Sequence, residues 1–118
     1  MPIRVLIVDD DPAFRATIAA VLTGRDYEIA GEAGSLTEAR LAIAELNPDA
    51  VLLDVNLPDG NGLSFVADLP RTGGAPPRFL LTSTDTHAAP RRLLSRAGGA
   101  GFIPKADLIA ADLTPYLG

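Results

Sequence analysis

The stretch IRVLIVDDDP, residues 3–12, joins a run of mostly aliphatic residues directly to three adjacent aspartates and a proline. Residues 3–8 are β-branched and mostly apolar, so they predict a buried strand. Asp11 then takes the position of a helix N-cap, and Pro12 suits the first helical residue. A buried strand that runs straight into a helix is the first half of a β–α–β unit, in which helices connect parallel strands.

The same alternation of strand and helix patterns repeats five times along the chain. The other expected strands cover residues 27–33, 50–53, 78–82 and 101–104, and the expected helices cover residues 12–24, 36–46, 62–69, 86–97 and 106–117. Strict alternation predicts a parallel sheet with helices on both faces. We therefore expect one α/β domain over residues 1–118, with a doubly wound five-stranded parallel sheet, for which 2-1-3-4-5 is one of the common strand orders.

Composition and charge narrow the class of protein. The chain has 118 residues, of which 47% are hydrophobic and 21% are charged, as expected for a globular domain with one core. The net charge of −5 argues against direct binding of nucleic acid or of an anionic membrane. Cysteine is absent, which excludes a disulfide framework and thiolate metal ligands. No apolar run is long enough for a membrane span and no signal peptide opens the chain, so we expect a cytoplasmic protein.

Polar residues follow four of the five expected strands. Ligands of open parallel sheets bind beyond the carboxyl ends of the strands, because these ends meet at one edge of the sheet. The residues in question are Asp9 and Asp10 after the first strand, Asp54 after the third, Thr82 at the end of the fourth, and Lys105 after the fifth. Lys105 is also the only lysine in the chain. We expect these side chains to converge on one site.

Such a cluster of acids needs a cation. Two carboxylates about 4 Å apart repel each other by roughly 4 kcal/mol at an effective dielectric of about 20. A magnesium ion (or manganese) prefers oxygen ligands, which Asp9, Asp10 and Asp54 can supply together with a backbone carbonyl. With Lys105 as a point charge and Thr82 as a hydroxyl donor, the group is suited to phosphoryl transfer. A carboxylate can itself be the nucleophile and form an aspartyl phosphate.

Each of these residues also has an ordinary structural interpretation. Asp11 is best explained as the helix cap, but the two further acids exceed what a cap needs. A single lysine is most often a solvated surface residue, and Thr82 would suit any strand. Phe102 is most simply a core residue. The site hypothesis therefore depends on the common position of these residues at strand ends.

Four motifs together resemble the receiver domain of two-component response regulators, the CheY-like, flavodoxin-like fold. They are VDDD (8–11), LLDVNLPDGNG (52–62), LLTS (80–83) and GFIPK (101–105), and the resemblance covers essentially the whole chain. It implies that Asp54 accepts a phosphoryl group from a histidine kinase or phosphotransfer protein. It also implies a magnesium site made by Asp9, Asp10, Asp54 and the backbone carbonyl of Asn56.

The resemblance assigns further roles. Lys105 would contact the phosphoryl oxygens, Thr82 would be the switch hydroxyl, and Phe102 would be an aromatic switch that changes rotamer. Asn56 and Thr84, each two residues past a site residue, lie where receivers tune dephosphorylation. The implied function is a phosphorylation-dependent switch, not an enzyme beyond its own phosphorylation and dephosphorylation. It would signal through the face made by the fourth helix, fifth strand and fifth helix, towards an output domain or a homodimer partner.

Two departures from that family pattern accompany the match. Serine stands at position 83, where a smaller alanine is common, and this substitution can alter access to the site. Many receivers have a proline after the lysine, whereas here Pro104 precedes Lys105 and Ala106 follows it.

Two other function classes remain open from the sequence. Asp9 and Asp11 also satisfy the Asp-x-Asp pattern of haloacid-dehalogenase-like phosphatases, with Asp9 as nucleophile and Asp11 as acid/base. Against this, the chain is short, lacks a cap module and has Ala13 where threonine or valine is usual. The third class is an interaction module of the same fold that works without phosphorylation.

Overall fold

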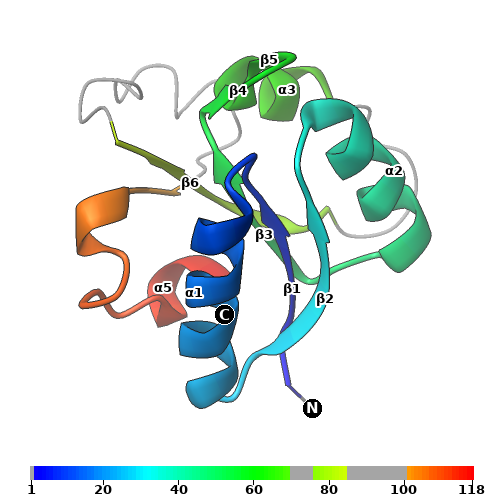
Figure 1. Cartoon of the computed structure of the whole chain (residues 1–118). Coiled ribbons are helices and arrows are strands. Elements are labelled where there is room, and N and C mark those ends of the chain that lie inside the picture. The colour runs from blue at the N-terminus through cyan, green and yellow to red at the C-terminus, as the bar shows by residue number, and fades with distance from the viewer. Residues whose placement is uncertain (1, 70–75, 85–100) are drawn as a thin grey trace.

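The computed structural model describes residues 2–69, 76–84 and 101–118, and the helix expected over residues 86–97 lies outside these ranges. Five parallel strands form the main sheet in the order β2-β1-β3-β6-β7, which confirms the predicted topology (Figure 1). The strands are β1 (Arg4–Val8), β2 (Glu28–Ala33), β3 (Ala50–Asp54), β6 (Arg78–Ser83) and β7 (Gly101–Pro104). Their ends lie within one residue of the predicted ones.

The helices lie on both faces of this sheet. In chain order, the described α-helices are α1 (Pro12–Gly24), α2 (Leu36–Leu46), α3 (Gly62–Asp68) and the short α5 (Thr114–Leu117). A two-residue antiparallel pair, β4 (Asn56–Leu57) with β5 (Gly60–Asn61), leads from β3 into α3. None of the described helices is long and apolar enough to cross a bilayer.

Alternating side chains of the buried strands supply two cores. On one face Leu6, Val8 and Leu53 pack with residues of α2 and α3. On the other face Val5 and Ile7 pack with α1 and with the C-terminal segment. Figure 1 shows this division, with α1 and α5 together on one side of the sheet and α2 and α3 on the other. This two-sided burial explains why the central strands are almost uniformly apolar.

Helix caps fix where α1 and α2 begin. The Asp11 carboxylate accepts a hydrogen bond from the backbone N–H of Ala13 at 3.0 Å, and Pro12 follows it as predicted. Ser35 caps α2 by accepting from the N–H of Glu38 at 3.2 Å. Because Asp11 is held at the start of α1, that helix begins directly beyond the carboxyl end of β1.

The prediction of a single helix over residues 106–117 is wrong. The segment forms a 3₁₀ turn at Lys105–Asp107, an irregular stretch, and then α5. Pro115 has no N–H and its ring clashes with the preceding turn, so a continuous helix cannot pass through it. Instead the Asp112 carboxylate accepts from the Thr114 N–H at 3.0 Å, and Pro115 falls in the first turn of α5. The Arg25 guanidinium donates to the carbonyls of the irregular stretch, including that of Ala111 at 2.7 Å.

Candidate functional site

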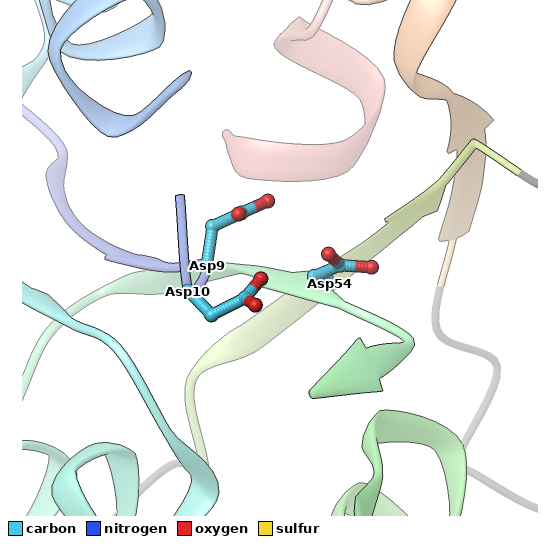
Figure 2. A group of neighbouring side chains, drawn as sticks. All are labelled: Asp9, Asp10 and Asp54. Carbon is cyan, nitrogen blue, oxygen red and sulfur yellow. The ribbon is translucent and has the colours of Figure 1, made fainter. Parts of the chain in front are cut away.

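Three carboxylates gather beyond the carboxyl ends of β1 and β3. Asp9 and Asp10 directly follow β1, and Asp54 is the last residue of β3. Val8 pairs with Leu53 in the sheet, which sets Asp9 beside Asp54. One oxygen from each of the three carboxylates lies within 4.8 Å of the others, and Figure 2 shows the side chains turned towards a common space. The convergence predicted from the strand ends is therefore present.

Lys105 closes the cluster from the end of β7. Its ammonium nitrogen lies 2.6 Å from Oδ2 of Asp9 and 3.2 Å from Oδ2 of Asp54. Asp9 and Asp54 are both buried, whereas Asp10 is exposed. Within the described part of the chain, one ammonium thus accompanies three carboxylates, which leaves an excess of negative charge.

Burial and charge shift two pKa values at this site. Burial raises the pKa of Asp54, and this effect outweighs the lowering by the Asn56 backbone N–H and by Lys105. Burial alone would disfavour the charge on Lys105, but the carboxylates of Asp9 and Asp54 outweigh it and raise the pKa of the ammonium. Asp54 is thus a comparatively basic carboxylate, and Lys105 stays cationic beside it.

The arrangement fits a hard divalent cation. Oδ1 of Asp9 accepts a hydrogen bond from the Asp11 N–H at 2.9 Å, and its buried Oδ2 faces the Lys105 ammonium at 2.6 Å. Asp10 is exposed and makes no hydrogen bond or ion pair within the described part of the chain. A buried carboxylate oxygen beside an open carboxylate is a donor set that suits an oxygen-seeking ion. Asp9, Asp10 and Asp54 are therefore the residues that could hold magnesium.

Thr82 and Phe102 lie on the neighbouring strands. Thr82 pairs with Asp54 across β3 and β6, and its buried hydroxyl donates to the Ile103 carbonyl of β7 at 2.7 Å. Phe102, the residue before Ile103, is half-buried against the core that contains α2 and α3. The hydroxyl that was predicted to act as a switch is thus bonded to the strand that carries the predicted switch aromatic.

The loop after Asp54 connects to the end of β6. The Asn56 N–H donates to Oδ1 of Asp54 at 3.1 Å, and the Asn56 side-chain amide donates to the Ser83 hydroxyl at 3.1 Å. Thr84 is exposed at the end of β6. The serine that departs from the family pattern is therefore the hydrogen-bond partner of Asn56, a contact that sequence reasoning did not predict.

The first turn of α1 adds two neighbours that sequence reasoning missed. The Phe14 ring lies under the Lys105 ammonium, with Nζ 4.4 Å from the ring centroid. The Arg15 guanidinium donates to the Asp9 carbonyl at 2.5 Å and pairs with Glu32 at 3.1 Å. Their position in the sequence was the available signal, because both residues lie in the first turn of the helix that Asp11 caps.

A doubly wound α/β domain with acids and a lysine at one sheet edge defines a class of domains that act on or carry phosphoryl groups. Comparison with known families makes the assignment specific. The chain belongs to the response regulator receiver domain family, whose model matches residues 5–111. Receiver domains of this family act in phosphorylation-dependent two-component signalling.

Similar proteins carry this domain beside different output functions. Over 85 residues the chain is 45% identical to a protein-glutamate methylesterase/protein-glutamine glutaminase of Agrobacterium fabrum, which covers 71% of this chain and 24% of that protein. It is 40% identical over 83 residues to the DNA-binding response regulator MtrA of Mycolicibacterium smegmatis, covering 70% of this chain and 36% of MtrA.

The beryllofluoride-activated receiver domain of Klebsiella pneumoniae RstA superposes with a TM-score of 0.74 at 30% identity, covering 91% of this chain and 92% of that one. The chain thus spans about a quarter to a third of the length of the two curated relatives. The shared part is the receiver domain, and the two relatives differ in their named output.

Proposed function

We propose that this domain is a phosphorylation-dependent signalling switch in which Asp54 accepts a phosphoryl group from a histidine kinase or a phosphotransfer protein. The observation that carries the proposal is the pairing of one ammonium, on Lys105, with both Asp9 and Asp54 beside the open carboxylate of Asp10. Phosphoryl transfer needs charge neutralisation and positioning more than covalent help from the protein.

Asp54 performs the covalent step. One of its carboxylate oxygens forms a bond to phosphorus as the bond between phosphorus and the donor imidazole nitrogen breaks, and the imidazole leaves with the electron pair. The raised pKa of Asp54 makes its carboxylate a better nucleophile than an ordinary surface aspartate. After the transfer, the negative charge lies on the phosphoryl oxygens, farther out than the Asp54 carboxylate. The Lys105 ammonium then turns from the carboxylate oxygens to the phosphoryl oxygens.

Magnesium, when bound, would neutralise charge on the acids and on the phosphoryl group. Its proposed ligands are Asp9, Asp10 and Asp54 with the Asn56 backbone carbonyl. Asp10 and Asp54 would be the more direct ligands, and the exposure of the Asp10 carboxylate beside Asp54 supports this for Asp10. Manganese would serve the same donor set.

Thr82 and Phe102 would carry the signal away from the site. To reach a phosphoryl group, the Thr82 hydroxyl gives up its bond to the Ile103 carbonyl. That loss loosens β7 next to Phe102, which then turns further into the core. The consequence is a shift between two populated arrangements of the face formed by the fourth helix of the family fold, β7 and the segment that follows it.

The partners and setting follow from this role. The domain extends over residues 1–118, lies in the cytoplasm, and catalyses only its own phosphorylation and dephosphorylation. Its activated face would contact an output domain or a second copy of the chain, without direct contact to nucleic acid. Asn56 and Thr84 would set how long the aspartyl phosphate persists.

Peptide mapping by mass spectrometry after incubation with acetyl phosphate and Mg²⁺ tests the assignment. We expect one added phosphoryl group on Asp54 and none in Asp54→Asn. Asp68→Asn, which changes an exposed acid at the end of α3, should label like the wild type. Undiminished labelling of Asp54→Asn would contradict the proposal.

The same experiment separates the alternatives. A phosphoryl group on Asp9, or repeated turnover of a phosphomonoester, would favour the hydrolase. The engagement of the Asp11 carboxylate as a helix cap weighs against that alternative, because its acid/base would be Asp11. Failure to bind Mg²⁺ or beryllofluoride would favour the phosphorylation-independent interaction module.

A further inference from the structure

We infer that Phe14 is a positioning residue for Lys105, which holds the ammonium between Asp9 and Asp54 through a cation–π contact. The inference rests on the proposed phosphoacceptor role of Asp54 and adds a residue outside the motifs that identify the family. Its basis is the geometry around one nitrogen atom, which lies 2.6 Å from Asp9, 3.2 Å from Asp54 and 4.4 Å from the Phe14 ring centroid.

These three contacts confine the ammonium on three sides. A lysine ammonium is a compact charge on a four-carbon stem with several rotatable bonds, so its direction must be set by its surroundings. Two carboxylate oxygens attract it from the sheet, and the electron-rich face of the ring attracts it from α1. The Lys105 side chain is only 16% exposed. The ring therefore occupies space into which the ammonium could otherwise turn towards water.

The position of the ring is itself well fixed. Phe14 lies in the first turn of α1, which the Asp11 cap ties to the end of β1. The next residue, Arg15, donates to the Asp9 carbonyl and anchors the same turn to the acid-bearing loop. The Phe14 side chain also packs against the core on the α1 face of the sheet. The first turn of α1 thus contacts the backbone of Asp9 through Arg15 and the Lys105 ammonium through Phe14.

A phosphoryl group on Asp54 moves the negative charge outwards, and Lys105 has to follow it. A ring face attracts a cation over a range of positions, because the attraction is not confined to one direction as a hydrogen bond is. Phe14 therefore keeps the ammonium within the site in both states and keeps water from one side of it. Without the ring, part of the Lys105 population turns away and binds phosphoryl oxygens less well.

The uniqueness of Lys105 in the sequence makes this contact measurable. Lysine labelled with ¹³C at the ε-carbon yields one side-chain signal, and a ring face over the ammonium shifts its ε-protons upfield. Phe14→Leu keeps an apolar side chain but removes the ring, whereas Phe14→Tyr keeps the ring. Tyr27→Leu is the matched control, because Tyr27 packs against the same core but makes no cation–π contact with Lys105 in the described structure.

We expect the upfield shift in the wild type, Phe14→Tyr and Tyr27→Leu, and its loss in Phe14→Leu. Beryllofluoride in the presence of Mg²⁺ should bind about fivefold more weakly to Phe14→Leu, the equivalent of about 1 kcal/mol, and Phe14→Tyr should restore the affinity. Binding of Mg²⁺ alone, measured by calorimetry, should be unchanged. Circular dichroism checks folding, and Phe14→Met replaces Phe14→Leu if the latter unfolds.

An unchanged lysine signal in Phe14→Leu would overturn the contact, and unchanged beryllofluoride affinity would overturn the positioning role. The positioning role would also be overturned if Phe14→Leu bound Mg²⁺, without beryllofluoride, more weakly by the same factor. The substitution would then have disturbed the carboxylates and not Lys105. If the wild-type protein binds Mg²⁺ but not beryllofluoride, the proposed function is refuted. A role of Phe14 in phosphoryl binding is then refuted as well. The failure is recognisable because it occurs without any substitution.

Discussion

Replacing Asp10 with asparagine should stabilise the metal-free protein and remove its stabilisation by magnesium. Asp10 is the exposed member of a cluster of three carboxylates, of which the Lys105 ammonium pairs with the other two. Asparagine keeps the size and polarity of the side chain and removes its charge. The substitution therefore reports on repulsion within the cluster more than on packing.

The separation of the acids bounds the size of the effect. Two unit charges 4.8 Å apart repel by about 0.9 kcal/mol at a dielectric of ~80 and by about 3.5 kcal/mol at ~20. Asp10 is exposed and Lys105 offsets part of the repulsion, so the lower end applies. We expect Asp10→Asn to raise the free energy of unfolding by about 1–2 kcal/mol at low ionic strength.

Magnesium should offset this difference in stability. A ligand at ten times its Kd that binds only the folded state stabilises it by about 1.4 kcal/mol. The wild type should gain this amount, whereas Asp10→Asn, with one carboxylate fewer, should gain little. The gap between the two proteins should therefore close as magnesium is added.

Urea unfolding in EDTA and in a magnesium series measures both effects. Glu45→Gln, an equal loss of charge on an exposed residue of α2, should show neither the stabilisation nor the altered magnesium response. Equal stability of Asp10→Asn and wild type in EDTA would refute the repulsion argument. Equal stabilisation of both by magnesium would refute the assignment of Asp10 as a ligand.

Three further substitutions test the surroundings of the site. A Cβ at position 62 would lie 2.7 Å from the carbonyl oxygen of Asp54, so Gly62→Ala should cost about 1–3 kcal/mol in urea unfolding and slow acetyl-phosphate labelling. Asp59→Ala should destabilise the protein at neutral pH, because backbone N–H groups at the start of α2 hold the pKa of Asp59 below its usual value. That stabilisation is present above the ordinary aspartate pKa and lost as the pH falls through the lower folded-state value, so the difference from wild type should vanish in acid. Ser83→Ala, which frees the Asn56 side chain, should shorten the aspartyl-phosphate lifetime about two- to threefold in a phosphate-release assay.

The first of these substitutions has a matched control, and each of the three has a contrary result. Gly24→Ala adds a methyl group where no atom lies within 4 Å, and it should leave labelling intact. Equal labelling of Gly62→Ala would show that the loop tolerates the methyl group. A pH-independent effect of Asp59→Ala would exclude its charge as the cause. An unchanged phosphate lifetime in Ser83→Ala would mean that the Asn56 contact has no part in dephosphorylation.

The fold was predictable because its signals are local or periodic. Aliphatic runs of strand length and the cap at Asp11 each act within a few residues, and the structure confirms them. The convergence of the acids followed from a general property of parallel sheets, so strand ends were sufficient to locate the cluster. Neither inference required side-chain geometry.

The unpredicted features depend on contacts between distant parts of the chain. The predicted C-terminal helix is interrupted for two reasons. Pro115 lies in the first turn of a new helix, and the Arg25 guanidinium, more than eighty residues earlier, donates hydrogen bonds to carbonyls of the irregular stretch. The start of α2 is bonded to Asp59 across a separation of 22 or 23 residues. The ring of Phe14 lies under Lys105 only because α1 and the end of β7 meet. Such contacts have no periodic signature in the sequence.

The three adjacent aspartates show how neighbouring like charges in a sequence can be accommodated in a stable fold. Asp11 turns to the N-terminus of α1, where the backbone N–H groups and the helix dipole favour its charge. Asp9 is buried, and it is compensated by the Asp11 N–H and by Lys105. Asp10 is exposed beside Asp54 and has no hydrogen bond or ion pair among the described residues. Two of the three charges are thus compensated in different ways, and the third belongs to the exposed carboxylate that a metal can reach from solvent.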